Sequence, residues 1–392
     1  MARNATATEI DIFTEDAILN PHEYYRQLRD RGAAIWMDKY DCWVLPRHRE
    51  VKAGLEDHGT FSSGSGVCLN GMMNDTMAGS SALQSDPPAH TRLRRMLGSR
   101  LTPRALNAHK DAIQERADAL VSALLDKGSF DVVADFSLSF PISVVPDLLG
   151  CPADGRDHLL KWASAAFQAT GPMNERTSAA LPALQEFLGY TNRLVDENLL
   201  SAGGWGDQML QEARAGEIDE ATLPLLLVDY LGPSIDTTTN ALSVAIWKLG
   251  EQPDQWRAVR RDPTLINNIV DEAVRFEAPI RGFSRLLTSD FETEDGTLPA
   301  GDRVFFLYGS ANRDERFWQN PNVFDVTRDT TGHVGFGGGI HRCVGQGLAK
   351  LEAKALFTAL VQKVSEIEVG EPEWGVHNIL RGISRMPATL RG

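Results

Sequence analysis

The chain has 392 residues, of which 42% are hydrophobic, and its formal net charge is −14. This length permits one large or two ordinary domains with a sizeable core, and the acidic balance argues against nucleic acid as a general partner. Residues 1–6 lack the apolar run of a signal peptide, and apolar runs such as 223–228 are too short to cross a bilayer. The four cysteines form no CxxC pair, which argues against a zinc site or a disulfide framework. We therefore predict a cytoplasmic protein without a membrane segment.

The first hundred residues combine regular elements with one long polar segment. Residues 21–29 predict a helix, and the apolar runs 34–37 and 42–45 predict a strand hairpin. Residues 61–85 are rich in Ser, Gly, Asn and Met and predict a long loop, either a mobile surface segment or a pocket wall in which Met side chains adapt to apolar ligands.

The segment 86–95 then predicts the start of a helix, because two prolines precede a helical run. His90 and Arg94 are four residues apart in it and share one helix face. This pair suits an anionic ligand, with an ordinary surface cluster as the alternative.

Helical patterns dominate from residue 104 to about residue 200, and the longest pattern covers residues 219–249. Pro224 indicates that its regular part begins a turn later than residue 219. Pro233 lies in the middle of this pattern, where proline costs roughly 3 kcal/mol and removes one backbone donor. The alternatives are a break between two helices and one continuous helix with a functional distortion. We favour the continuous helix.

The C-terminal third predicts short strands and a glycine-rich loop. Residues 281–291 and 304–307 have strand-like composition, and Glu272 and Arg275 share one face of the preceding helix. The loop 335–345 contains five glycines and Cys343, and a helical pattern follows it. Backbone N–H groups at such a helix start stabilise a thiolate. The whole pattern predicts one integrated domain, residues 1–392, that is mainly α with small β-sheets.

Four motifs in order give this chain a resemblance to bacterial cytochromes P450 over nearly its whole length. The loop from Phe336 to Gly345 matches the haem-binding pattern FGxGxHxCxG, and Glu272 and Arg275 match ExxR. Residues 86–94 match DPPxHxxxR, and Asp236-Thr237 matches the acid–alcohol pair of the long helix. The cysteine loop is highly specific, whereas ExxR alone is weak.

The resemblance implies haem b held between the long central helix and the C-terminal cysteine loop, with Cys343 as the axial thiolate ligand of the iron. Glu272, Arg275 and Arg328 are expected to form a structural network behind that loop. The glycines are expected to let the backbone lie close to the porphyrin. The expected cofactor-binding residues are His90, Arg94, Arg285, Phe336, Gly337, Gly339, His341, Cys343 and Gly345, of which His90, Arg94, Arg285 and His341 would pair with the haem propionates.

The same resemblance makes Asp236 and Thr237 the expected catalytic residues. Thr237 would hydrogen-bond O2 at the haem, and Asp236 would relay protons. The chain departs from the family pattern just before them, because Pro233-Ser234 stands where Ala-Gly is usual. We expect the oxygen-binding groove to survive, with Ser234 as a candidate for replacing one lost hydrogen bond.

The chain looks most like the P450s that hydroxylate or O-demethylate small aromatic compounds. The candidate substrate-pocket residues are Met72, Met73, Phe167, Asp229, Pro233, Ile280 and Phe283, in walls formed by residues 61–85, 162–173, 229–237 and 280–283. Residues 61–90 contain no Lys or Arg to pair with a benzoate, so we predict a neutral aromatic such as a methoxyphenol. Asp229 is placed to accept a hydrogen bond from a phenol, and Arg281 is the one candidate counter-ion.

This length leaves no room for a reductase domain, so the resemblance implies a separate ferredoxin and reductase, with O2 as co-substrate and a monomeric enzyme. Basic residues expected around the cysteine-loop face suit an acidic partner. They are Arg92, Arg95, Arg100, Arg104, Arg342, Lys350 and Lys354. The alternatives are a terpenoid or natural-product substrate, a peroxide-driven haem-thiolate enzyme, and a non-enzymatic haem binder, and the retained Asp236-Thr237 pair argues against the last two.

Overall fold

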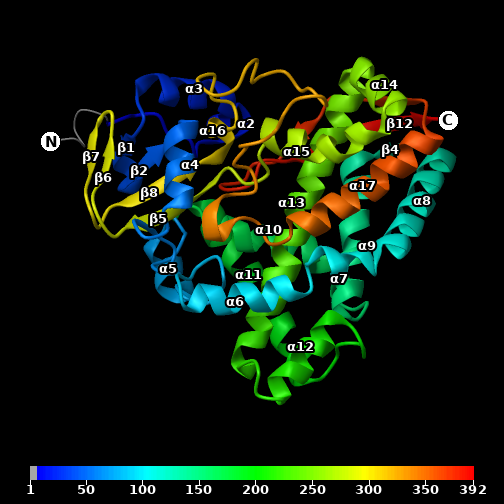
Figure 1. Ribbon diagram of the computed structural model, residues 1–392, viewed down its shortest axis with the longest axis horizontal. Helices are drawn as coiled ribbons and strands as arrows, with labels where there is room; N and C mark the ends of the chain where they lie inside the picture. The colour runs from blue at the N-terminus through cyan, green and yellow to red at the C-terminus, as the bar shows by residue number, and fades with distance from the viewer. Residues whose placement is uncertain (1–6) are drawn as a thin grey trace.

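The computed structural model describes residues 7–392, so the segment 1–6, which lacks a signal-peptide pattern, lies outside the described residues. A five-stranded sheet with short helices forms one side of the molecule, and a larger helical part forms the other (Figure 1). This arrangement confirms the predicted mainly α architecture with small sheets. The two largest buried apolar clusters follow the same division, one among the helices and one around the sheet.

The five-stranded sheet has the order β1-β2-β8-β5-β3. Its strands are β1 (Ile35–Met37), β2 (Cys42–Leu45), β3 (Phe61–Ser62), β5 (Gly282–Leu287) and β8 (Arg303–Leu307). β1 and β2 form the predicted antiparallel hairpin, whereas β2 pairs with β8 in parallel, with Val44 opposite Phe305. Nearly every residue of β2 and β8 is buried, which suits their uninterrupted apolar and aromatic sequences. The helices near this sheet are α2 (Glu15–Leu19), α3 (Pro21–Arg31), α4 (His48–Glu56) and α16 (Tyr308–Ala311).

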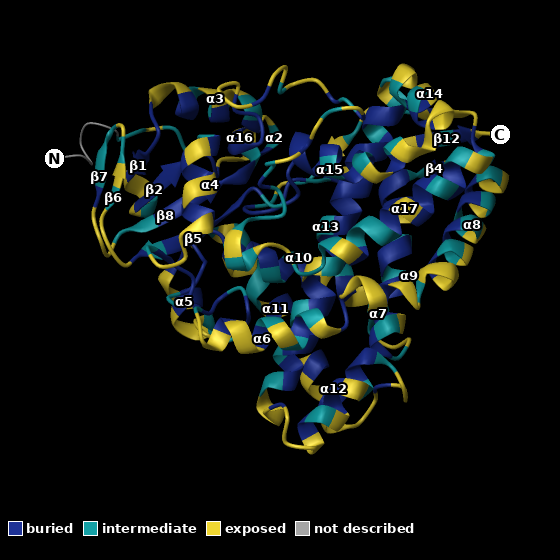
Figure 2. Cartoon of the chain, in the orientation of Figure 1, coloured by how far each residue is buried: buried dark blue, intermediate teal, exposed yellow. Residues whose placement is uncertain are grey.

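The helical part is assembled around α13 (Leu223–Glu251), which has 29 residues and is about 44 Å long at the standard rise. The helices of this part are α6 (Ala89–Ser99), α7 (Pro103–Asn107), α8 (Lys110–Lys127), α9 (Ser139–Leu149), α10 (Leu159–Gln168), α11 (Glu175–Asp196), α12 (Trp205–Arg214), α14 (Pro253–Arg261), α15 (Ile266–Phe276) and α17 (Gln346–Lys363). Most residues of α13 are buried (Figure 2). An apolar helix of this kind is stable only inside the protein.

α13 runs without interruption through Pro233, so the alternative of two shorter helices is wrong. The helix begins at Leu223, with Pro224 in its first turn, as the sequence predicts. Pro233 cannot donate to the carbonyl of Asp229, which costs free energy. Burial of apolar residues on both sides of the proline offsets this loss, because Leu231 and Ile235 are fully buried.

Smaller sheets lie at the edges of the fold. They comprise β4 (Ser129–Asp131), β12 (Pro387–Arg391) and β9 (Glu366–Val369); β10 (Glu373–Trp374) with β11 (Ile383–Arg385); and β6 (Phe291–Thr293) with β7 (Gly296–Leu298). The segment Val132–Leu149 is apolar enough by composition to cross a membrane, but 56% of it is buried inside the fold. It forms a π-helical turn (Val132–Ser137) and α9, so it behaves as a core segment.

Three predicted elements differ from the structure. Residues 61–85 are not one loop, because β3 and helix α5 (Gly71–Met77) lie within them. Asn70 caps α5 by accepting from the backbone N–H of Met73, and this cap outweighs the weak helix propensity of the segment. The helix expected across 162–173 ends at Gln168. The strand-like segment 281–291 forms β5 and then begins the separate strand β6.

Candidate active site

Cys343 lies in the glycine-rich loop directly before α17 and is exposed, whereas the other cysteines are buried. Those cysteines are Cys42, Cys68 and Cys151, and burial raises the pKa of each thiol to about 12. Desolvation raises the pKa of the Cys343 thiol. The backbone N–H groups of Gly345 and Gln346 and the guanidinium of Arg94 act in the opposite direction and lower this pKa. These donors favour a thiolate at the N-terminus of α17. Cys343 therefore fits the role of a thiolate metal ligand.

The loop glycines are required by contacts within the protein itself. Gly337 and Gly339 have φ values of +68° and +56°, where L side chains are strained. A Cβ on Gly339 would lie 2.2 Å from the carbonyl oxygen of Leu55 in α4, and one on Gly335 would lie 2.4 Å from Val274 in α15. The sequence interpretation assigned these glycines to porphyrin contact, whereas the structure shows that neighbouring helices already demand two of them.

A buried network supports the cysteine loop from behind. Glu272 and Arg275 are completely buried and form a double salt bridge, with N···O distances of 2.6 and 2.8 Å. Arg328 donates to the same carboxylate at 3.2 Å, and Arg275 also donates to the carbonyl of Asn312 at 3.0 Å. Asn312 in turn accepts from the backbone N–H of Val334, at the entry of the loop, at 2.8 Å. The three predicted partners therefore come together and connect α15 to the cysteine loop.

Four cationic or hydrogen-bonding side chains, His90, Arg94, Arg285 and His341, gather beside this loop. The rings of His90 and His341 are 4.6 Å apart, and the Nε2 atoms of both are buried without a partner. Burial, together with the nearby charges of Arg285 and His90, lowers the pKa of His341 to about 3. Arg94 and Arg285 form no salt bridge within residues 7–392. Two unpartnered imidazole nitrogens and two guanidinium groups without a carboxylate partner fit an anionic ligand, and the carboxylates of haem propionates have the required chemistry.

Sequence reasoning missed two neighbours of this cluster. Tyr308 is buried and hydrogen-bonds Arg285, whose Nη1 also donates to the carbonyl of Ser284 at 2.7 Å. Asp86 accepts from the hydroxyl of Ser62 at 2.5 Å, and its charge acts on Arg285 and His341. Asp86 belongs to the quoted DPPxHxxxR segment, so its position was available from the sequence. Nothing in the sequence around Tyr308 indicated its contact.

Asp236 and Thr237 lie on different faces of α13. Thr237 is partly exposed, and its hydroxyl donates to the carbonyl of Pro233 at 2.6 Å. Asp236 is 7% exposed and is hydrogen-bonded by the side chains of Asn240, at 3.2 Å, and Ser164. Burial raises the pKa of Asp236 to about 7, which suits proton exchange near neutral pH. Within the described residues, the side chain of Ser234 makes no hydrogen bond that would replace the one lost at Pro233.

A cavity lies between α13, α5, α10 and β5 and contains five of the predicted pocket residues. Its volume is about 100 Å³, comparable with the roughly 150 Å³ that holds a benzene ring in an engineered protein. Apolar side chains form most of its walls, and none of the lining residues is Lys, Arg or His. The predicted residues that line it are Met73, Phe167, Asp229, Pro233 and Phe283.

Two predicted pocket residues lie elsewhere. The side chain of Met72 is 46% exposed on the outer face of α5, because the following residue, Met73, occupies the inner face. Ile280 is outside the cavity and packs against the apolar cluster around the sheet. Arg281, the candidate counter-ion, is 1% exposed and donates to Tyr25 Oη and to the carbonyls of Ile12 and Asn378. It is therefore not available to a ligand.

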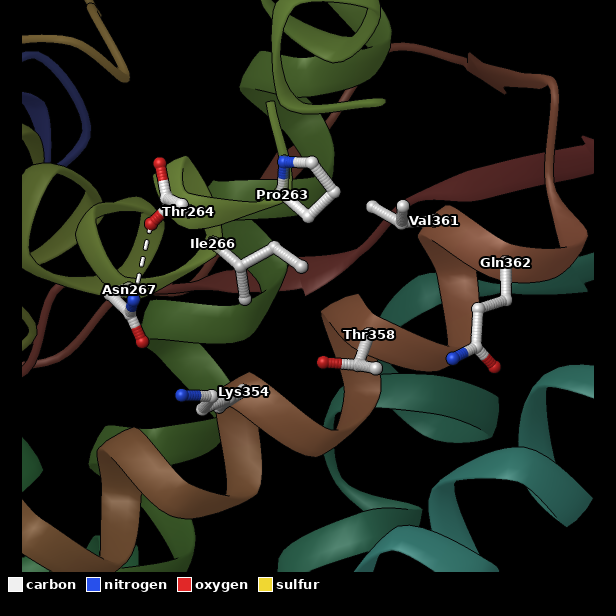
Figure 3. A pocket seen from close by; sticks show the side chains of 8 residues that line it. All are labelled: Pro263, Thr264, Ile266, Asn267, Lys354, Thr358, Val361 and Gln362. Carbon is white, nitrogen blue, oxygen red and sulfur yellow. Dashed lines mark hydrogen bonds between the residues drawn. The ribbon is translucent and has the colours of Figure 1, made fainter. Parts of the chain in front are cut away.

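A wider hollow lies on the outside of the molecule between α15 and α17 (Figure 3). Its lining residues are Pro263, Thr264, Ile266, Asn267, Lys354, Thr358, Val361 and Gln362. The one hydrogen bond drawn among them joins Asn267 to Thr264, within a single turn. The hollow contains neither the cysteine loop nor the acid–alcohol pair and is not the active site.

Comparisons with known proteins agree with this geometry. Residues 205–369 match the family model described as Cytochrome P450. The chain is 37% identical over 385 residues to Cytochrome p450 CYP199A2 of Rhodopseudomonas palustris, which covers 97% of this chain and 93% of that protein. It is 30% identical to the vitamin D(3) 25-hydroxylase of Pseudonocardia autotrophica, which covers 100% and 99% of the two chains.

Solved structures are similar over nearly the whole fold. The Mycobacterium marinum cytochrome P450 CYP268A2 in complex with pseudoionone superposes with a TM-score of 0.88 at 25% identity, covering 98% of this chain and 99% of that one. Cytochrome P450 CREJ in complex with (4-ethylphenyl) dihydrogen phosphate superposes with a TM-score of 0.86 at 26% identity, covering 95% and 98%. This chain therefore belongs to the cytochrome P450 family and is a monooxygenase with haem as its cofactor and a cysteine thiolate as the iron ligand.

Proposed function

We propose that this monooxygenase inserts one oxygen atom into a small, neutral aromatic substrate, either by hydroxylation or by oxidative O-demethylation of a methoxy group. The observation that carries the proposal is the small cavity beside Asp229 and Pro233, whose lining contains no cation. Burying a carboxylate without a partner costs several kcal/mol, so benzoates are disfavoured. The cavity volume of about 100 Å³ also disfavours a terpenoid or other large natural product.

The reaction consumes the substrate, O2, two electrons and two protons, and it yields the hydroxylated product and water. When the attacked carbon is a methoxy group, the hydroxylated ether breaks down to a phenol and formaldehyde. Haem, when bound, supplies the activation of O2. The protein must hold the haem, orient the substrate, deliver protons and receive electrons.

We assign haem binding to the cysteine loop and to the four side chains gathered beside it. Cys343 is the proposed iron ligand, supported by the N–H groups of Gly345 and Gln346. His90, Arg94, Arg285 and His341 are the proposed partners of the propionates, supported by the unpartnered Nε2 atoms of the two histidines and by the absence of a salt bridge to either arginine within residues 7–392. A Cys343→Ser variant should therefore lose the red-shifted Soret band of the reduced CO complex that marks thiolate ligation.

Proton delivery is assigned to Asp236 and Thr237. Thr237 donates to Pro233, so its oxygen keeps lone pairs that can accept a further hydrogen bond. Asp236 lies one residue earlier, with its pKa raised to about 7 by burial. A carboxyl group of this pKa gains and loses a proton readily near neutral pH.

We assign electron transfer to a separate ferredoxin that docks beside the cysteine loop. α6 packs there, since a Cβ on Gly98 would lie 3.8 Å from Val344, and α7 packs against the start of α17. The exposed cations on these elements form no ion pair within residues 7–392. They are Arg92, Arg95, Arg104, Arg342 and Lys354. They suit an acidic partner.

Two of the predicted docking cations are not free. Arg100 is 6% exposed and is paired with Glu212, with an N···O distance of 2.7 Å. Lys350 is paired with Asp271 at the same distance, 2.7 Å. The proposed docking surface is therefore smaller than the sequence suggested.

The relatives add limited support for the substrate class. CREJ has been solved with (4-ethylphenyl) dihydrogen phosphate, a small aromatic ligand with an anionic group. The cavity of this chain offers no Lys or Arg to such an anion. We therefore propose that the substrate of this chain has a small aromatic ring, as the ligand of CREJ does, but carries no negative charge.

A spectral titration of the haem-loaded enzyme tests the proposal. Neutral ligands, 4-methoxyphenol and 4-methoxytoluene, are expected to shift the Soret band from low to high spin and to be oxidised with ferredoxin and reductase. The matched anion 4-methoxybenzoate should give no shift at the same concentrations. Tight binding of 4-methoxybenzoate with no response to either neutral ligand would overturn the proposal.

A further inference from the structure

Three polar atoms on residues that line the substrate cavity lack a hydrogen-bond partner. Ser80 Oγ, Gln84 Oε1 and Asp229 Oδ2 are buried and have no hydrogen-bond partner within the described residues. Two of the three, the amide and carboxylate oxygens, act as acceptors, and the hydroxyl oxygen of Ser80 can also accept. Buried polar atoms are normally paired, so three unpaired ones on one cavity wall indicate a ligand group.

Asp229 is held so that one oxygen stays free. The backbone of Ala82 hydrogen-bonds its carboxyl group, which fixes the side chain between α13 and the segment 78–85. The segment itself is folded into tight turns by backbone bonds from Gly79 to Gln84 and from Gln84 to Ser81, at 2.6 and 3.2 Å. The remaining carboxylate oxygen is the unpaired Oδ2. Asp229 is thus pre-oriented toward a donor that the protein does not supply.

We propose that Asp229, with Gln84 and Ser80, recognises a hydroxyl donor on the substrate ring, and that this contact selects phenols among neutral aromatics. This inference rests on the proposed function, because it concerns the substrate of the same cavity. A ligand with acceptors only, such as a carboxylate or an ether, would leave the amide oxygen of Gln84 and the ionised carboxylate oxygen of Asp229 unpaired, because only the hydroxyl of Ser80 could donate to it. An ammonium group would require a buried ion pair in a cavity lined mostly by apolar side chains, and desolvating its charge would be costly.

The position of Asp229 on α13 also bears on which end of the ring would be oxidised. Thr237, at the proposed oxygen site, lies eight residues further along the helix, a rise of about 12 Å. A phenol whose hydroxyl is bound at Asp229 directs its para position along α13 toward Thr237. An ortho substituent would instead remain close to Asp229. The structure therefore favours para-substituted phenols over ortho-methoxyphenols.

The test compares 4-ethylphenol with 4-methoxytoluene, a ligand of similar size without a donor, on the haem-loaded wild type and an Asp229→Leu variant. The wild type should bind 4-ethylphenol more tightly. The variant should lose about 10- to 100-fold in affinity for 4-ethylphenol and less than about threefold for 4-methoxytoluene. Asp75→Asn, an exposed carboxylate on α5, is the matched control and should change neither affinity.

Asp229→Asn keeps the shape of the side chain and covers the case in which the leucine variant fails to bind haem. It should weaken 4-ethylphenol binding and improve binding of 4-methoxybenzoate, because the charge is lost and an N–H donor is gained. If the wild type binds both neutral ligands equally, or if the Asp229 variants weaken both equally, the inference is overturned while the proposed function stands. If the wild type oxidises 2-methoxyphenol in preference to its para isomer, the assigned orientation is overturned. If only 4-methoxybenzoate binds, the proposed function fails as well.

Discussion

The two sides of the proposed haem site are built in opposite ways. Behind the cysteine loop, Glu272 and Arg275 are completely buried, and Arg275 uses its donors on one carboxylate and three carbonyl groups. On the substrate side, Asp229 and Gln84 are left with unpaired oxygens. Complete pairing fixes one geometry, whereas unpaired groups in a cavity remain available to a ligand. The residues behind the cysteine loop therefore hold one fixed geometry, whereas the substrate side leaves polar atoms free to hydrogen-bond a ligand.

The largest expected effect comes from breaking the paired side. Glu272→Ala leaves the buried guanidinium of Arg275 and the partly buried guanidinium of Arg328 without their carboxylate, and we expect a loss of about 3–5 kcal/mol in the free energy of unfolding. Thermal or urea unfolding of the purified protein measures this loss, and the haem content should fall with it.

Glu23→Gln is the matched control, because Glu23 and Arg26 form a pair of the same i,i+3 spacing on an exposed face. Because both side chains are in solvent, we expect its effect on the free energy of unfolding to be much smaller than that of Glu272→Ala. Equal losses for the two variants would show that burial does not distinguish the pairs.

A smaller effect is expected from the proton-delivery pair. Thr237→Ala removes the hydroxyl that donates to Pro233 and should reduce the product formed per NADH consumed by about tenfold or more. Thr237→Ser retains a hydroxyl and should recover most of this coupling. Coupling that is unchanged in the alanine variant, together with full activity driven by hydrogen peroxide, would instead favour a peroxide-driven enzyme.

The smallest predicted effect is a dependence of substrate binding on pH. Burial raises the pKa of Asp229 to about 7, far above the usual range of an aspartate. The ionised form prevails above that pH and accepts a stronger hydrogen bond than the protonated form. The affinity for 4-ethylphenol should therefore rise severalfold from pH 6 to pH 8, below the range in which the phenol itself ionises.

The other titratable lining residue, Cys68, has a pKa raised to about 12 and does not interfere. Asp236 titrates in the same range, with its pKa raised to about 7, so Asp229→Asn is the necessary control. A pH dependence that persists in this variant would assign the effect to Asp236 or to the haem side.

The sequence predicted the paired side better than the substrate side, for physical reasons. Motifs such as the ExxR pair and the cysteine loop encode contacts between residues at fixed spacing, and both arrangements could be read before the structure. The orientation of Met72, by contrast, depends on the position of helix α5, which a polar cap at Asn70 creates in a segment that otherwise resembles a loop.

Arg281 shows a similar limit. Its charge suggested a role at the pocket, but its hydrogen-bond partners come from residues 12, 25 and 378, far away in the sequence. Local pattern carries no information about such partners. Likewise, Tyr308 directly follows β8, which pairs with the strand that carries Arg285, so the contact between these two side chains depends on tertiary structure and not on local sequence.

The contacts of Arg281 also constrain when the protein can complete its fold. Arg281 joins the carbonyls of Ile12 and Asn378, which lie near the two ends of the chain. During synthesis Ile12 is added 269 residues before Arg281, and Asn378 is added 97 residues after it. The start of strand β5, which carries Phe283 into the substrate cavity, therefore cannot be fully anchored until the segment around Asn378 has been synthesised.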